Sequence, residues 1–120
     1  MRPVLLDCDT GIDDAVALTY LACLHRQGTI NLAAVTTTAG NTTAAQAAMN
    51  SRFVLDQCLL VDVPVAAGCT EPLQVPLVTT PETHGPLGVG YAEHSVDLPP
   101  APPGEWMRLW DEAIHEHEDL

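Results

Sequence analysis

The sequence is poor in basic residues. Lysine is absent, and four arginines stand against sixteen aspartates and glutamates, which gives a net charge of −12 at pH 7. A chain this acidic repels phosphate backbones and anionic lipid, so nucleic acid and negatively charged membranes are not expected partners. The composition instead favours a small, neutral molecule as the ligand.

Long apolar runs are also missing. Asp7 interrupts the N-terminal apolar residues before the core of a signal peptide could form, and no later run approaches the roughly 20 residues of a membrane span. The sequence therefore predicts a soluble chain that is not exported through an N-terminal signal. At 120 residues, of which 47% are hydrophobic, it has enough apolar content for the core of one domain at most.

Closely spaced cysteine pairs are missing as well. The successive separations of the cysteines are 15, 35 and 11 positions, so no Cys-x-x-Cys pair exists for a zinc site or a redox motif. The four are Cys8, Cys23, Cys58 and Cys69. In apolar or turn surroundings a free thiol acts as a small hydrophobe. We therefore predict reduced thiols and a cytoplasmic location.

The N-terminus does contain a strand, a turn and a helix in close succession. The apolar residues 4–6 predict the end of a buried strand, Thr10 and Gly11 predict a turn, and Ile12 begins a helical pattern. Ligands of open α/β sheets gather at the carboxyl ends of strands. This turn is therefore the expected location of a functional site.

Four carboxylates lie in this short stretch: Asp7, Asp9, Asp13 and Asp14. Alternation along a strand should point Asp7 and Asp9 to the same side, and the turn should bring the other two back, so we expect all four in one small volume. Two carboxylates about 5 Å apart repel by roughly 3 kcal/mol at an effective dielectric of about 20, and oxygen ligands suit Ca²⁺ or Mg²⁺. Helix N-terminal stabilisation alone would explain only Asp13 and Asp14.

Residues 7–15 closely resemble the N-terminal signature of the nucleoside hydrolases, the calcium-dependent enzymes of the inosine-uridine-preferring group. The usual pattern is Asp-x-Asp-Pro-Gly-x-Asp-Asp followed by a helix, and this chain has threonine where proline is commoner. The resemblance implies a role for each carboxylate. Asp9 would be a metal ligand and the general base, Asp14 a metal ligand, Asp13 the residue that holds ribose hydroxyls, and Asp7 would complete the metal site from beneath.

The rest of the chain alternates between helical and extended patterns. The expected elements are a helix over 12–27 that ends at Gly28, a strand over 31–38, a helix from 44 to about 58, a strand over 63–68 and a helix from 105 to about 117. A strand, helix and strand within about 35 residues form parallel strands. We predict an α/β fold with a Rossmann-like, open, mainly parallel sheet of the nucleoside hydrolase type, incomplete at the C-terminus.

Two polar residues outside the acidic stretch join the candidate site. Asn41 follows the second strand and should lie at the same sheet edge as Asp9, although Gly40-Asn41 could also be a simple turn. In the resembled family this Asn lies beside the metal and the catalytic water. His84 begins a segment, 84–90, that resembles the family's His-Gly loop over the sugar end of the site. His84 would then contact substrate, and the alternative is a water-exposed histidine within the Pro/Gly-rich stretch 73–104, which we interpret as an active-site loop.

The resemblance runs from Val4 to about Gly90. The chain stops after its last expected helix, where a further strand would follow, and an apolar face at Trp106 and Trp110 would lack its full cover. In the family, later segments add a carbonyl and an Asp to the calcium site and a His that protonates the departing base. We interpret residues 1–120 as the N-terminal part of a single nucleoside hydrolase domain.

The implied function is hydrolysis of the N-glycosidic bond of a ribonucleoside to ribose and free base, with Ca²⁺ as cofactor and a homo-oligomer as the family's assembly. A second hypothesis is a truncated, inactive remnant that binds metal or a partner. A third is a haloacid-dehalogenase-like phosphatase, with Asp7 as nucleophile and Asp9 as acid/base. That family expects Thr or Val where this chain has Gly11, and it gives no role to Asp13 and Asp14.

Overall fold

A three-stranded parallel sheet, in the order β1-β2-β3, organises the computed structural model, which describes residues 1–120. The elements in chain order are β1 (Arg2–Cys8), α1 (Ile12–Arg26), β2 (Ile30–Thr37), α2 (Ala44–Gln57), β3 (Val65–Ala67), α3 (Pro81–His84) and α4 (Glu105–Glu116). The predicted parallel strand-helix-strand unit and the α/β class are confirmed.

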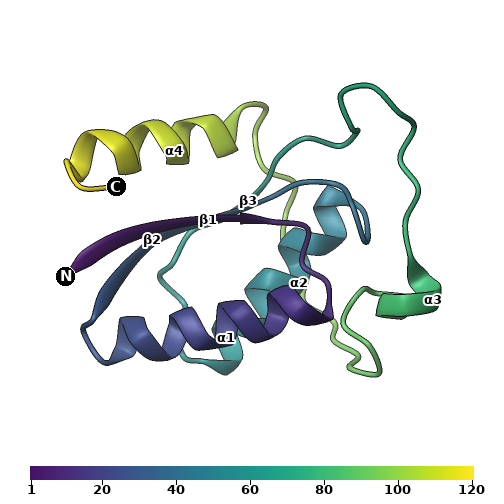
Figure 1. Cartoon of the computed structure of the whole chain (residues 1–120), viewed down its shortest axis with the longest axis horizontal. Helices are drawn as coiled ribbons and strands as arrows, with labels where there is room; N and C mark the ends of the chain where they lie inside the picture. Colours follow the sequence, from purple (N-terminus) through teal and green to yellow (C-terminus); the bar gives the residue numbers. More distant parts are fainter.

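The sheet lies between two layers of helices (Figure 1). Helices α1 and α2 pack against each other and against one face of the sheet, and α4 covers the opposite face over β2 and β3. The central strand β2 is buried along most of its length, as expected of a parallel strand with helices on both sides. The carboxyl ends of β1 and β2 thus reach the same edge of the sheet.

Two apolar clusters hold these layers together. The larger one joins α1 and α2 to the sheet through fully buried side chains such as Leu18, Val35 and Leu55. The smaller one joins α4 to β2 and β3 through Leu109. Trp110 adds a polar contact to this second layer, because its indole Nε1–H donates to Thr36 Oγ1 over 2.9 Å.

The ends of the two long helices follow from local sequence. Gly28, two positions beyond the end of α1, adopts a φ of +73°, which glycine tolerates without steric cost. The helix α2 starts at Ala44 and is capped by Thr43, whose side-chain oxygen accepts from the backbone N–H of Gln46 over 3.2 Å. Both ends agree with the sequence prediction.

The C-terminal half differs from prediction in four details. The third strand is only three residues long, and the loop contains a short helix, α3, that the sequence pattern did not predict. The helical spacing of Leu109, Ala113 and Ile114 predicts that they share the apolar side of the last helix, but Ile114 is 57% exposed. The acidic residues around His117 predict a solvated helix end, but His117 is half-buried and its Nε2 lies 3.3 Å from Asn31 Nδ2.

All four cysteines are free, as predicted. None of the helices combines the length and the apolar character that crossing a bilayer would need.

Candidate functional site

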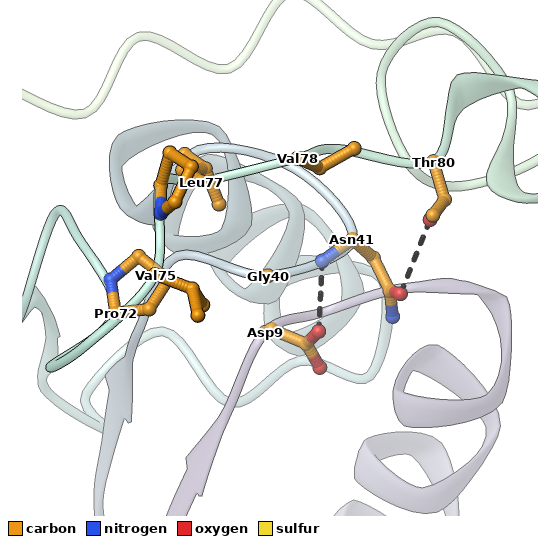
Figure 2. A pocket seen from close by; sticks show the side chains of 9 residues that line it. Asp9, Gly40, Asn41, Pro72, Val75, Leu77, Val78 and Thr80 are labelled. Atoms are coloured by element: carbon orange, nitrogen blue, oxygen red, sulfur yellow. Dashed lines mark hydrogen bonds between the residues drawn. The ribbon is translucent and has the colours of Figure 1, made fainter.

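The candidate site begins where β1 and β2 end at one edge of the sheet. The backbone N–H of Asn41 donates to Asp9 Oδ2 over 2.8 Å, and Figure 2 shows the two residues facing each other across the turn. Gly40 makes this approach possible, because a Cβ at that position would overlap Asp9 Oδ2 and lie 2.9 Å from Asp9 Cγ. The predicted meeting of Asp9 and Asn41 at the sheet edge is therefore confirmed.

Asp14 brings a second carboxylate to this edge from the first turn of α1. Its Oδ2 accepts from the backbone N–H of Gly11 over 3.3 Å. Burial raises the pKa of Asp14, and the adjacent Asp9 carboxylate raises it further, as does the negative charge of Asp13. Asp9 and Asp14 therefore form a close pair of like charges, a pair that favours either a shared proton or a bound cation.

Asp7 does not join this pair. Its Oδ1 accepts from Thr36 Oγ1 over 2.6 Å, and its side chain lines a separate cavity of about 240 Å³ beside Trp106 and Trp110. No group of three or more His, Cys, Asp or Glu side chains is placed where it could hold a metal ion. The expectation that four carboxylates share one small volume is wrong, because Asp7 still belongs to β1 whereas Asp9 has already left it.

The Asp9–Asp14 pair nevertheless has the chemistry that a hard cation requires. Both donors are carboxylates, and the salt bridges of the chain involve Arg52, Arg108 and His115 but neither of these two aspartates. Because Ca²⁺ takes roughly six to eight oxygens, a cation held here would complete its shell with water or other oxygen ligands. The residues present thus fit one side of a calcium site.

The loop between β3 and α4 returns to the same edge. Thr80 fastens it, because the Thr80 backbone N–H donates to the Asn41 carbonyl over 3.0 Å and its hydroxyl donates to Asn41 Oδ1 over 3.3 Å. His84, four residues later, accepts the Ile12 backbone N–H on Nδ1 over 3.0 Å. His84 is therefore a half-buried neighbour of the acidic turn rather than a water-exposed loop residue.

Gly11 lies between His84 and Asn41. A Cβ on Gly11 would lie 2.5 Å from His84 Nδ1 and 2.6 Å from Asn41 Nδ2. The bond from Ile12 also fixes the tautomer of a neutral imidazole: Nδ1 is the acceptor, so the proton is on Nε2. His84 can therefore offer an N–H donor to a bound molecule.

A cavity of about 460 Å³ opens beside Asp9 and Asn41. One wall is polar, from Asp9, Asn41 and Thr80, and the other is apolar; Figure 2 shows Pro72, Val75, Leu77 and Val78 along it. An apolar cleft of this size with a few convergent polar groups is typical of a small-molecule site. The acidic turn is thus accessible to a ligand from this side.

Sequence reasoning missed Thr80 and the apolar wall. A threonine in a loop carries no periodic signal, and its importance arises only when the loop folds back on Asn41. The Pro/Gly-rich composition of 73–104 indicated a functional loop, but it could not show which residues would line the cavity.

Comparison with known proteins is consistent with this geometry. Residues 4–119 match the family model described as inosine-uridine preferring nucleoside hydrolase. The chain is 44% identical over 99 residues to an inosine-uridine preferring nucleoside hydrolase of Leishmania major, covering 82% of this chain and 29% of that protein. It is 40% identical over 88 residues to a pyrimidine-specific ribonucleoside hydrolase of Photobacterium profundum, covering 73% of this chain and 27% of that protein.

The fold has a similar counterpart among solved structures. A plant nucleoside hydrolase superposes with a TM-score of 0.76 at 26% sequence identity, covering 92% of this chain and 36% of that one. The chain thus spans about 30% of the length of the curated relatives that it matches.

Proposed function

Because this chain belongs to the inosine-uridine preferring nucleoside hydrolase family, we propose that it acts in hydrolysis of the N-glycosidic bond of a ribonucleoside, giving ribose and free base. The observation that carries the proposal is the Asp9–Asn41 contact of 2.8 Å at the mouth of a 460 Å³ cavity, with Asp14 paired to Asp9. The relatives named for inosine-uridine and pyrimidine ribonucleoside hydrolysis support this substrate class.

We propose Asp9 and Asp14 as the residues that hold a divalent cation, Ca²⁺. A bound cation supplies Lewis-acid chemistry, lowering the pKa of a coordinated water and binding sugar hydroxyls. Asp7 was predicted as a third ligand. Its bond to Thr36 instead supports a structural contribution from beneath the turn.

In the proposed reaction Asp9 is the general base. Its carboxylate accepts a proton from water as the water oxygen attacks the anomeric carbon of the ribose. The nucleobase departs with the electron pair of the broken C–N bond. Positive charge develops on the sugar ring in an oxocarbenium-like transition state, and the negative charge of Asp13 and Asp14 stabilises it. Asn41 keeps Asp9 oriented through its backbone N–H.

The ribose is proposed to lie between the acidic turn and the loop. Asp13, which is exposed at the start of α1, would accept hydrogen bonds from ribose hydroxyls, and His84 would donate from Nε2–H. We further propose a cytoplasmic location, which the four free cysteines support. The homo-oligomer that the family resemblance implies stays a prediction.

The test is release of ribose from inosine and uridine by the chain with Ca²⁺, measured as reducing sugar. Asp9→Asn should lower the rate by about 10²- to 10⁴-fold, the usual contribution of a general base. Asp62→Asn is the matched control, because Asp62 is exposed and lies beside His25 and His117, at the amino-terminal edge of the sheet. Equal rates for Asp9→Asn and the unchanged chain would overturn the role of Asp9.

A second readout separates the two remaining hypotheses from hydrolysis. Calcium binding that depends on Asp9 and Asp14, without any ribose release, would support the remnant hypothesis. Release of phosphate from p-nitrophenyl phosphate with Mg²⁺ would instead favour the phosphatase.

A further inference from the structure

Asn50, on α2, joins three segments that are far apart in the sequence. Its side chain is fully buried. The amide Nδ2 donates to the Thr10 carbonyl over 3.3 Å and to the Leu87 carbonyl over 2.6 Å. The amide Oδ1 accepts from His94 Nε2 over 2.7 Å and from Gln46 Nε2 over 3.0 Å.

These four bonds use the full hydrogen-bonding capacity of the amide. Carbonyl oxygens accept only, so the Nδ2 end must face Thr10 and Leu87, and the Oδ1 end must face His94 and Gln46. No other side chain of this size supplies two donors and an acceptor for two further donors. An aspartate of the same shape would place a carboxylate against two carbonyl oxygens, in a buried position where the repulsion is weakly screened.

The bonds of Asn50 connect the two halves of the candidate site. Thr10 belongs to the acidic turn, one residue after Asp9, and Leu87 belongs to the loop, three residues after His84. Gly88 passes close to the same junction, since a Cβ there would lie 3.2 Å from Asn50 Nδ2 and 3.4 Å from the Thr10 carbonyl oxygen. The loop is thus fixed against the turn at a point close to the His84–Ile12 contact.

His94 closes the junction from the outer side. Its ring stacks on Phe53 with centroids 4.7 Å apart, and its Nε2–H reaches Asn50. The segment after the loop is thereby fastened to α2 as well. The chain is therefore bound to Asn50 at two points, Leu87 and His94. Between these points, Gly88 and Gly90 adopt positive φ values that allow the chain to turn tightly.

We propose that Asn50 is a positioning residue: it clamps the 84–90 loop to the acidic turn and so holds the His84 imidazole, with Nδ1 on the Ile12 N–H and Nε2–H free for a ligand. The inference rests on the proposed function, in which His84 contacts the sugar. Asn50 itself lies behind the turn and does not line the 460 Å³ cavity.

The test reads the His84 tautomer directly, by two-bond ¹H–¹⁵N correlation of the imidazole nitrogens in the 120-residue chain. In the unchanged chain we expect the Nε2–H tautomer. Asn50→Asp should move both His84 nitrogen shifts towards the average of the two tautomers, because the loop is released. Asn31→Asp is the matched control: Asn31 also contacts a histidine, His117, but at the opposite sheet edge, so His84 should not change.

A second variant, Gly88→Ala, perturbs the junction from the loop and leaves the α2 core residue in place. The added Cβ, at a φ of +89°, should shift His84 in the same way. Unchanged methyl shifts of Leu18 and Val35 report an intact core. His84 shifts that stay at the wild-type values in Asn50→Asp, or in Gly88→Ala if Asn50→Asp does not fold, would overturn the proposal. Since the readout needs no turnover, it is independent of whether the chain hydrolyses nucleosides.

Discussion

Replacing Gly40 by alanine should displace the Asp9 carboxylate and separate the two turns slightly. Gly40 is not among the glycines with positive φ, so an alanine fits its backbone conformation. The obstacle is space, because the added Cβ would overlap Asp9 Oδ2 and lie 2.9 Å from Asp9 Cβ and Cγ. The Asp9 side chain must therefore rotate away from Asn41, and because rotation does not move the Asp9 Cβ, the backbone must also give by a few tenths of an ångström.

The size of the effect follows from the bond that is lost. A hydrogen bond to a charged acceptor contributes roughly 1.5 to 3 kcal/mol, and here it fixes Asp9 through the Asn41 N–H at 2.8 Å. The proposed cation binds the Asp9 carboxylate in this orientation. Loss of the bond should therefore lower calcium affinity by about 10- to 100-fold, since about 1.4 kcal/mol corresponds to a tenfold change in affinity.

Two measurements check this prediction, calcium titration by calorimetry and the amide proton shift of Asn41. The shift should move upfield in Gly40→Ala as its charged acceptor leaves. Gly28→Ala is the control, because position 28 has a φ of +73° and no atom within 4 Å of an added Cβ, so it loses stability without touching the site. A folded Gly40→Ala chain with unchanged calcium affinity and an unchanged Asn41 shift would refute the argument.

Three further predictions concern stability. Arg52→Ala should lower the free energy of unfolding by roughly 2 to 4 kcal/mol, as measured by urea unfolding. The half-buried guanidinium donates hydrogen bonds of 2.6 to 2.7 Å to the Asp56 carboxylate and to the carbonyls of Leu60 and Val63. Thr36→Val should cost about 1 to 3 kcal/mol in the same assay, since it leaves the Trp110 indole N–H without its acceptor. Burial lowers the pKa of His94, so the unfolded chain binds more protons below pH 6.5, and stability should fall as the pH drops from 6.5 through the lower folded-state pKa. In His94→Phe, which keeps an aromatic ring for Phe53, urea midpoints measured across this range should show a smaller decline.

Much of the fold could be predicted because it depends on local pattern. The stop of α1 before Gly28 and the β-branched run of β2 each act within a few residues of chain, although the apolar Ile12 and Val16 of α1 are exposed. The meeting of Asp9 and Asn41 followed from a general property of parallel sheets, whose carboxyl ends share one edge. These features need no knowledge of how the loops fold.

The loop contacts could not be predicted in the same way. These contacts join residues that are far apart in the sequence. Asn50 on α2 is 37 positions from Leu87 and 44 from His94, and Thr80 is 39 positions from Asn41. A single sequence gives no register for such contacts, because Pro/Gly-rich segments have no hydrophobic period. The resemblance pointed to His84 but not to the buried amide that fixes its loop.

The separation of Asp7 from Asp9 shows where the alternation rule stops. Side chains two apart share a face only while both residues are in the strand, and β1 ends at Cys8, between them. Asp7 is paired in register with Thr36, whose hydroxyl meets both the Asp7 carboxylate and Trp110, so Asp7 faces the α4 layer. Asp9 lies past the strand end, where the chain turns towards Asn41. Two aspartates at the same two-residue spacing therefore lie in different surroundings: Asp7 supports the packing of α4 on the sheet, and Asp9 lies beside Asn41 at the carboxyl edge.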